Sequence, residues 1–214
     1  GHPAHRPDGR HDGGGLGPGV LIARIDVLTI FPALVSTLRD YGVTGRALAR
    51  GLLQLTTWDP RAFTQDRHGS VDDRPYGGGP GMVMKPEPLA AAVIAAQADR
   101  IGEPARVVYL SPQGQILDQA GVCRLAERDL ILVAGRYEGV DERVRQALVT
   151  DEISIGDYVL TNGALAAAVV IDAVVRLVPG VVGGEGAVET ESFSDGRLDY
   201  PQYTRPAEFR GMAV

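Results

Sequence analysis

Short apolar runs alternate with stretches of helical periodicity from Val20 onward, and glycine or proline separates most of these segments from the next. Strands that alternate with helices are typical of an α/β domain with a mostly parallel sheet and helices on both faces. The apolar runs predict strands at Leu21–Phe31, Leu53–Thr57, Arg106–Leu110, Asp129–Ala134 and Glu152–Ile155. The periodic stretches predict helices at Pro32–Asp40, Thr44–Arg50, Glu87–Arg100, Asp118–Arg128, Asp141–Leu148 and Ala164–Val178.

The chain divides into four parts by pattern and composition. Its 214 residues are enough for one sizeable core with a small appendage. Residues 1–19 are polar, glycine-rich and aperiodic, which predicts a disordered extension outside the fold. Residues 20–182 carry the alternating pattern and form the expected domain. Residues 183–199 are acidic and loop-like, as in a linker, and residues 200–214 are too few to fold alone.

Composition and charge exclude several classes of protein. A net charge of −6 and a pI near 5.2 argue against a basic, non-specific nucleic-acid binder. The single cysteine, Cys123, excludes an internal disulfide and a cysteine-based metal cluster, and we expect it in the core. Only His68 lies beyond the first eleven residues, so a general base is expected to be a carboxylate. The apolar stretch Ala164–Ile171 is too short to span a membrane.

Three glycine-containing loops follow predicted strands, at Ser111–Gly114, Gly135–Gly139 and Gly156–Gly163. Ligands of parallel sheets bind beyond the carboxyl ends of the strands. Glycine lets the backbone approach such a ligand closely. We therefore expect the binding site where these three loops meet.

Two segments allow both a functional and a structural interpretation. Gly77–Gly81 lacks the lysine of a P-loop and the helix junction of a dinucleotide fingerprint, so by itself it predicts a mobile hinge. The charged residues just before it, including Asp72, favour contact with a substrate. In the middle strand-end loop, Tyr137 could contact a ligand, or the loop could be an exposed turn in which Glu138 pairs with Arg143.

Six ordered motifs resemble those of the bacterial tRNA (guanine-N1)-methyltransferases. They are GVTGRA at Gly42–Ala47, DDRPYGGGPG at Asp72–Gly81, YLSPQG at Tyr109–Gly114, AGRYEGVDER at Ala134–Arg143, SIGDYVL at Ser154–Leu160 and YPQYTRP at Tyr200–Pro206. The resemblance extends from about Ile22 to Val214.

The resemblance implies a fold, an activity and an assembly. The activity is transfer of a methyl group from S-adenosylmethionine to N1 of guanosine 37 in tRNA, in the cytoplasm, with Mg²⁺ acting near the tRNA. The implied fold is an α/β domain with a deep trefoil knot, which general rules would not predict because knots are rare. The family forms homodimers whose active sites contain residues of both subunits. Its members continue past Gly211 into a helical tRNA-binding domain, so residues 200–214 are expected to begin that domain.

The motif match also assigns binding residues. The residues expected to hold S-adenosylmethionine are Tyr109, Leu110, Ser111, Pro112, Gly135, Glu138, Ile155, Gly156, Tyr158, Leu160 and Gly163. Gly81 is expected to close over the cofactor from the glycine segment. Asp72 and Tyr137 are expected to contact the substrate.

Guanine N1 must lose a proton as it is methylated, and negative charge builds toward O6. This chemistry favours a carboxylate base and a cationic stabiliser. The motif match places the base at Glu191, where the family has an aspartate. Arg176 matches the arginine that stabilises the charge on O6, although its spacing from Asp172 alone favours a surface ion pair. Asp199 matches a carboxylate that helps to read the target guanine.

The chain departs from the family pattern after Leu160, where Ser-Gly-Gly-Glu-Leu-Pro is replaced by Thr161–Ala166. Asn162 then occupies a glycine position, and we expect it to tolerate a left-handed backbone there. Two other functions stay open from the residues alone. One is a nucleotide-binding regulatory module without chemistry, and the other is a hydrolase in which Glu138 and Asp157 converge on a water molecule.

Overall fold

Five parallel strands form the centre of the molecule, whose computed structural model describes residues 22–182, 192–193 and 198–214. The strand order is β2-β1-β6-β5-β7, and each neighbouring pair is parallel. The strands are β1 (Arg24–Leu28), β2 (Gln54–Trp58), β5 (Arg106–Ile116), β6 (Leu130–Ala134) and β7 (Asp151–Ser154). The parallel α/β prediction is confirmed.

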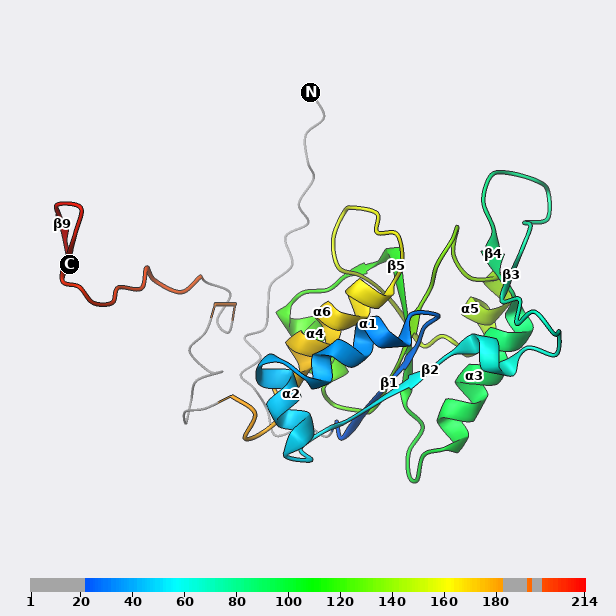
Figure 1. Cartoon of the computed structure of the whole chain (residues 1–214), viewed down its shortest axis with the longest axis horizontal. Coiled ribbons are helices and arrows are strands. Elements are labelled where there is room, and N and C mark those ends of the chain that lie inside the picture. Colours follow the sequence, from blue (N-terminus) through cyan, green and yellow to red (C-terminus); the bar gives the residue numbers. More distant parts are fainter. Residues whose placement is uncertain (1–21, 183–191, 194–197) are drawn as a thin grey trace.

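Helices cover both faces of this sheet, as predicted. Figure 1 shows one group on each side of the strands. One face carries α1 (Pro32–Ser36), α2 (Gly42–Ala49), α4 (Gln119–Leu125) and α6 (Ala164–Val175), and the other carries α3 (Pro86–Ala98) and α5 (Glu142–Leu148). The alternation along β6 explains the two layers. Leu130 and Leu132 pack into the α6 side, whereas Ile131 and Val133 pack into the α3 side.

Strand β5 differs from its prediction, because it continues to Ile116 through the segment expected to be a loop. The strand pairs with β7 in two registers, so that Ile153 lies opposite both Leu110 and Gln115. The four residues between these positions leave the β7 ladder as a bulge, which re-aims a strand locally. A Cβ atom on Gly114 would overlap the backbone of Ile153, so only glycine fits this return to the ladder.

The segment 59–81, which ends with the glycine segment Gly77–Gly81, contains short regular elements. A 3₁₀ helix, η2 (Pro60–Phe63), begins at Asp59, whose carboxylate accepts a hydrogen bond from the N–H of Arg61 at 2.9 Å. The pair β3 (Asp72–Asp73) and β4 (Val83–Met84) is antiparallel and encloses the glycine segment. A second 3₁₀ helix, η1 (Thr37–Arg39), follows α1.

The C-terminal segment contains the antiparallel pair β8 (Glu208–Phe209) and β9 (Met212–Ala213). Its residues are exposed, and Figure 1 shows it apart from the sheet and its helices. No helix within the described residues is long and apolar enough to cross a membrane. The helical domain implied beyond this segment stays a prediction.

Candidate functional site

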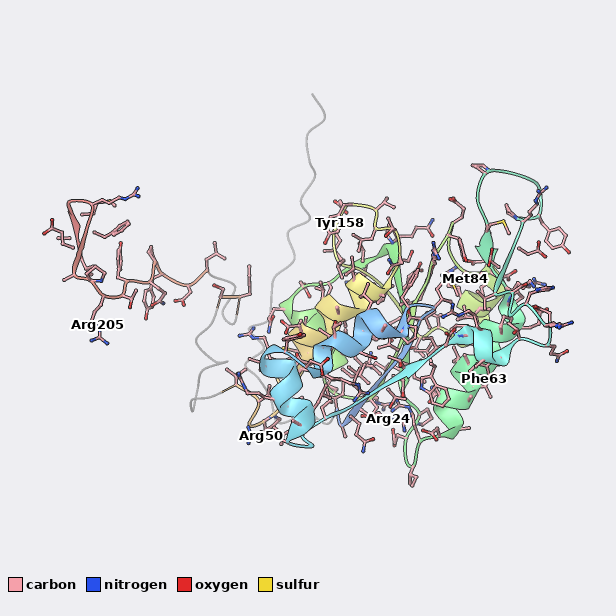
Figure 2. All side chains as sticks on the ribbon, in the orientation of Figure 1. Arg24, Arg50, Phe63, Met84, Tyr158 and Arg205 are labelled. Atoms are coloured by element: carbon pink, nitrogen blue, oxygen red, sulfur yellow. The ribbon has the colours of Figure 1, made fainter. Side chains whose placement is uncertain are left out.

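A cavity of about 260 Å³ opens at the carboxyl ends of β5, β6 and β7. The three glycine-containing loops meet there, as the sequence predicted. The predicted cofactor residues that line it are Tyr109, Leu110, Ser111, Pro112, Gly135, Glu138, Ile155, Gly156, Tyr158, Leu160 and Gly163. Tyr158, labelled in Figure 2, lies on the loop that follows β7. Segments that are far apart in the sequence therefore form one binding surface.

Close backbone packing joins two of these loops. The N–H of Gly163 donates to the carbonyl oxygen of Gly135 at 2.7 Å. A Cβ atom on Gly163 would lie 2.8 Å from Cα of Ala134 and 2.9 Å from the nitrogen of Gly135. Backbone atoms cannot move aside as the end of a flexible side chain can. Glycine at 163 therefore sets the width of the cavity between the loops.

Asn162 stabilises the start of α6 in a way that differs from the prediction. It is absent from the residues with positive φ, so its backbone is not left-handed. Its Oδ1 instead accepts a hydrogen bond from the N–H of Ala164 at 2.9 Å. This bond satisfies one of the N–H groups that the first turn of a helix leaves without a partner. The replacement of glycine by asparagine thus adds a cap.

Two polar side chains from the strands shape the cavity. Tyr109, at 8% exposure, lines the cavity, and burial raises the pKa of its phenol, so the hydroxyl stays protonated at neutral pH. Ser154 is buried at the end of β7, and its hydroxyl donates to the carbonyl oxygen of Gly156 at 3.0 Å. Sequence reasoning did not single out Ser154, although its place directly before Ile155 and Gly156 could have indicated a turn-holding role.

Gly81 lies next to the cavity without lining it. The N–H of Glu138 donates to the carbonyl oxygen of Met82 at 2.9 Å, and the N–H of Met84 donates to that of Gly139 at 3.0 Å. These bonds hold the residues that follow the glycine segment against the loop that follows β6. A Cβ atom on Gly81 would overlap the side chain of Glu138. The arrangement is consistent with the expectation that this segment covers a ligand.

Asp72 and Tyr137, both predicted substrate contacts, come together at the edge of the cavity, which Tyr137 lines. Tyr137 adopts a left-handed backbone with φ of 62°, which is uncommon for a residue other than glycine. Burial and the nearby negative charge of Asp72 raise the pKa of the Tyr137 phenol. Such strained positions gather at binding sites, where the surrounding structure holds them.

Glu138 is exposed at the cavity and does not form the ion pair that the structural interpretation required. Arg143 pairs with Asp141 instead, at 2.8 Å. Asp157 is exposed and is not among the residues that line the cavity. The geometry therefore does not bring Glu138 and Asp157 together as a hydrolase would need. Within the described residues no group of three or more metal-binding side chains occurs.

Of the three residues predicted for the chemistry, the two that the structure describes, Arg176 and Asp199, do not line this cavity. Arg176 lies at the C-terminal end of α6, whereas the cavity lies at its N-terminal end. A helix of 12 residues separates these two places by roughly 18 Å. Asp199 lies on the exposed C-terminal segment, where its carboxylate accepts from the N–H of Tyr200 at 2.8 Å. Glu191 lies outside the described residues.

Comparisons with family models, with related sequences and with solved structures all find the same kind of enzyme. The family model described as tRNA (Guanine-1)-methyltransferase TrmD matches residues 23–214. A tRNA (guanine-N(1)-)-methyltransferase of Shewanella sp. (strain ANA-3) is 58% identical over 191 residues, which cover 89% of this chain and 77% of the relative. The enzyme of that name from Shewanella frigidimarina is 57% identical over the same length. The crystal structure of tRNA (m1G37) methyltransferase from Aquifex aeolicus aligns with a TM-score of 0.76 and 40% identity, over 90% of this chain and 80% of that one.

Proposed function

The chain belongs to the tRNA (guanine-N1)-methyltransferase family, and from this premise we propose that it methylates N1 of guanosine 37 in tRNA with S-adenosylmethionine as donor. The observation that carries the proposal is the cavity in which the three strand-end loops meet. Glycine-rich loops at this edge of a parallel sheet are suited to binding a nucleoside-containing ligand through backbone groups.

The residues of the cavity fit the proposed cofactor. When bound, S-adenosylmethionine supplies a methyl group activated by a positively charged sulfonium. The exposed carboxylate of Glu138 would attract that charge from the cavity wall. Gly135 and Gly163 let the two loop backbones lie in direct contact, which gives the cavity a backbone wall whose polar groups an adenine could approach closely. The protonated phenol of Tyr109 offers a hydrogen-bond donor.

Three residues of this chain have roles in the proposed reaction: one accepts the proton, one stabilises the negative charge and one recognises the target base. The Glu191 carboxylate accepts the N1 proton of the target guanine. The Arg176 guanidinium stabilises the negative charge that develops on O6. Asp199 hydrogen-bonds to the guanine edge and selects the base. Mg²⁺ would act on the tRNA rather than in a site of protein ligands.

A homodimer with shared active sites explains how Arg176 could act. The exposed side of α6 carries Leu165 and Val169, which are 46% and 50% exposed, followed by Asp172 and Arg176. This spacing of four, three and four residues forms one stripe along a helix. If two copies crossed their α6 helices in opposite directions, Arg176 of one would approach the cavity of the other. We propose this arrangement for the cytoplasmic enzyme.

The same loops support the proposed knot. A knot of this kind requires close approach of backbone segments. The contact between Gly163 and Gly135 is such an approach. The implied trefoil knot is therefore compatible with the packing of this domain.

A methylation assay tests the proposal. The purified chain is incubated with S-adenosylmethionine and a tRNA transcript that has guanosine at positions 36 and 37, and nucleoside digests are analysed for 1-methylguanosine. A transcript with adenosine at position 37 is the control. We expect product from the first transcript alone. If the protein binds S-adenosylhomocysteine but methylates neither transcript, the regulatory module becomes the better interpretation.

The role of Glu191 is tested by comparing Glu191→Gln with Glu191→Asp. Loss of a general base lowers the rate by about 100-fold or more. We therefore expect that loss in Glu191→Gln, measurable activity in Glu191→Asp, and little change in Glu185→Gln, which removes a carboxylate of the same segment. Binding of S-adenosylhomocysteine should stay the same in all three. Full activity of Glu191→Gln would exclude this residue as the base.

A further inference from the structure

Arg136 follows β6 at the edge of the cavity, and its side chain lies between two aromatic rings. Its guanidinium carbon is 4.9 Å from the ring centre of Phe31 and 4.9 Å from that of Tyr137. Phe31 follows β1, the strand next to β6 in the sheet, so two neighbouring strand ends build this arrangement. Cation–π contacts of this kind hold a guanidinium in one plane.

The ring of Tyr137 is itself held in place. Its left-handed backbone, with φ of 62°, turns the ring back over the preceding residue. Its phenol lies close enough to the carboxylate of Asp72 in β3 for that negative charge to raise the pKa of the phenol. A non-glycine residue in this conformation is strained, so the surrounding contacts must hold it there. The structure thus maintains a strained turn whose direct result is the stacked position of Arg136.

Stacking leaves the N–H groups of Arg136 available. Within the described residues its side chain forms no hydrogen bond or ion pair, and its two aromatic contacts do not occupy its N–H groups with an acceptor oxygen. The five N–H donors lie in the plane of the group and form a fork that matches carboxylate and phosphate oxygens. The other nearby cation is already engaged, because Arg61 binds Asp59 and the carbonyl oxygen of Ile30.

The place of Arg136 connects the cavity with the region that holds Asp72. The residue lines the cavity, and its backbone forms a bridge with Asn162 in the loop after β7. On its other side lie Phe31 and the Tyr137–Asp72 pair. A negative group bound here would sit where the cofactor and the target nucleotide must meet. Arg136 is thus positioned for a reactant rather than for the core.

We propose that Arg136 is an oxyanion-binding residue that holds a reactant at the edge of the cavity. The inference rests on the proposed function, in which both reactants carry such a group. S-adenosylmethionine carries a carboxylate, and the tRNA carries phosphates on either side of the target guanosine. Either oxyanion would accept two parallel hydrogen bonds from the guanidinium.

The test compares Arg136→Gln and Arg136→Lys with the unsubstituted protein. Arg143→Gln is the matched control, since that arginine lies in the same stretch, is 71% exposed and pairs with Asp141. Calorimetry measures binding of S-adenosylhomocysteine, which has the carboxylate, and of 5′-methylthioadenosine, which lacks it. Steady-state kinetics measure the KM for the tRNA transcript at several salt concentrations. Thermal melting shows whether each variant is folded.

Two results support the proposal and identify the oxyanion. If it is the carboxylate, Arg136→Gln lowers affinity for S-adenosylhomocysteine about 10- to 100-fold and leaves 5′-methylthioadenosine binding unchanged. If it is a tRNA phosphate, both affinities stay constant, while the KM for tRNA rises by a similar factor and the salt dependence falls by about one unit. Arg136→Lys keeps the charge but loses the fork, so we expect an intermediate effect, and it replaces Arg136→Gln should that variant not fold.

The proposal is overturned if a folded Arg136 variant matches Arg143→Gln in both affinities and in KM. It is also overturned if binding of the two small ligands falls equally, because that result indicates general damage to the cavity. Failure of the proposed function looks different. In that case the unsubstituted protein itself neither binds S-adenosylhomocysteine nor methylates the transcript.

Discussion

The N–H of Gly163 donates to the carbonyl oxygen of Gly135, and there is no space for a side chain at Gly163. The two loops can stay in contact only because residue 163 is a glycine. The neighbouring Asn162 caps α6 rather than adopting the left-handed backbone that its glycine position suggested. At the scale of single residues the cavity depends on such close backbone contacts. Its lining is otherwise a mixture of ordinary side chains.

We predict that Gly163→Ala destroys ligand binding. The added methyl would lie 2.8 Å from Cα of Ala134, so the loops must separate. Calorimetry with S-adenosylhomocysteine should show an affinity reduced by about 100-fold or more, and thermal melting a loss of roughly 1–3 kcal/mol. Gly102→Ala is the control, since its φ of 105° strains alanine but its surroundings are open. Equal binding by both variants would contradict the role given to Gly163.

We predict slow alkylation of Cys123 at neutral pH. The residue packs against the core below α6, and burial raises the pKa of its thiol. Only the thiolate reacts, so a raised pKa lowers the reactive fraction of the thiol at any given pH. The alkylation rate therefore begins to increase only at a higher pH than for a free cysteine. Iodoacetamide labelling followed by mass spectrometry should be slower in the native protein than in urea. The same rate in both conditions would show that the thiol is not protected.

At the scale of elements, an ion cluster ties the amino ends of the strands together. Asp26 of β1 is fully buried and accepts hydrogen bonds from Arg24 at 2.9 Å and from Trp58 of β2 at 2.9 Å. Arg100, which follows α3, also binds Asp26 and reaches Asp129 before β6 at 2.7 Å. The cluster lies at the opposite edge from the cavity, so its role is to hold strands and helix in register.

We predict that Asp26→Asn lowers the free energy of unfolding by about 3 kcal/mol, because it leaves the buried Arg100 without one of its two carboxylate partners. Glu103→Gln, which removes the exposed partner of Arg128 at 3.5 Å, should change it by less than about 1 kcal/mol. Urea unfolding followed by circular dichroism measures both. A small effect of Asp26→Asn would mean that water or another group replaces the lost charge.

At the scale of the whole molecule, the exposed face of α6 is the surface that the proposed dimer would bury. Leu165 and Val169 project from a helix whose other side packs into the core. The cavity lies at one end of this helix and Arg176 at the other. One chain therefore contains both parts of the proposed site, but at a distance at which they cannot act together.

We predict that Val169→Glu dissociates the proposed dimer. A charge in the middle of an apolar contact must lose its hydration without gaining a partner. Sedimentation should show a monomer, and methylation should fall about 100-fold or more while S-adenosylhomocysteine still binds. Ile94→Glu on α3, where the isoleucine is 59% exposed, is the control, and sedimentation of this variant should still show a dimer. A dimer that survives Val169→Glu would place the interface elsewhere.

Much of the fold could be predicted because its elements depend on neighbouring residues. Strand β6 was expected at Asp129–Ala134 and lies at Leu130–Ala134. The helix expected from Asp118 begins at Gln119 because the Asp118 carboxylate caps it, accepting from the N–H of Gly121 at 2.7 Å. The bulge of β5 was not predicted, since it arises from a register shift against Ile153, which lies about forty residues away.

The sequence by itself determined the alternation of strands and helices, the glycine loops at the strand ends and, through its motifs, the family. These features are local, because each depends on periodicity, caps and turn residues within a few positions. Only the tertiary structure decided that β6 lies between β1 and β5, which brings Phe31 over Arg136 and places Gly163 against Gly135. Strand order depends on how both faces of the sheet bury their side chains, and no local pattern encodes that packing.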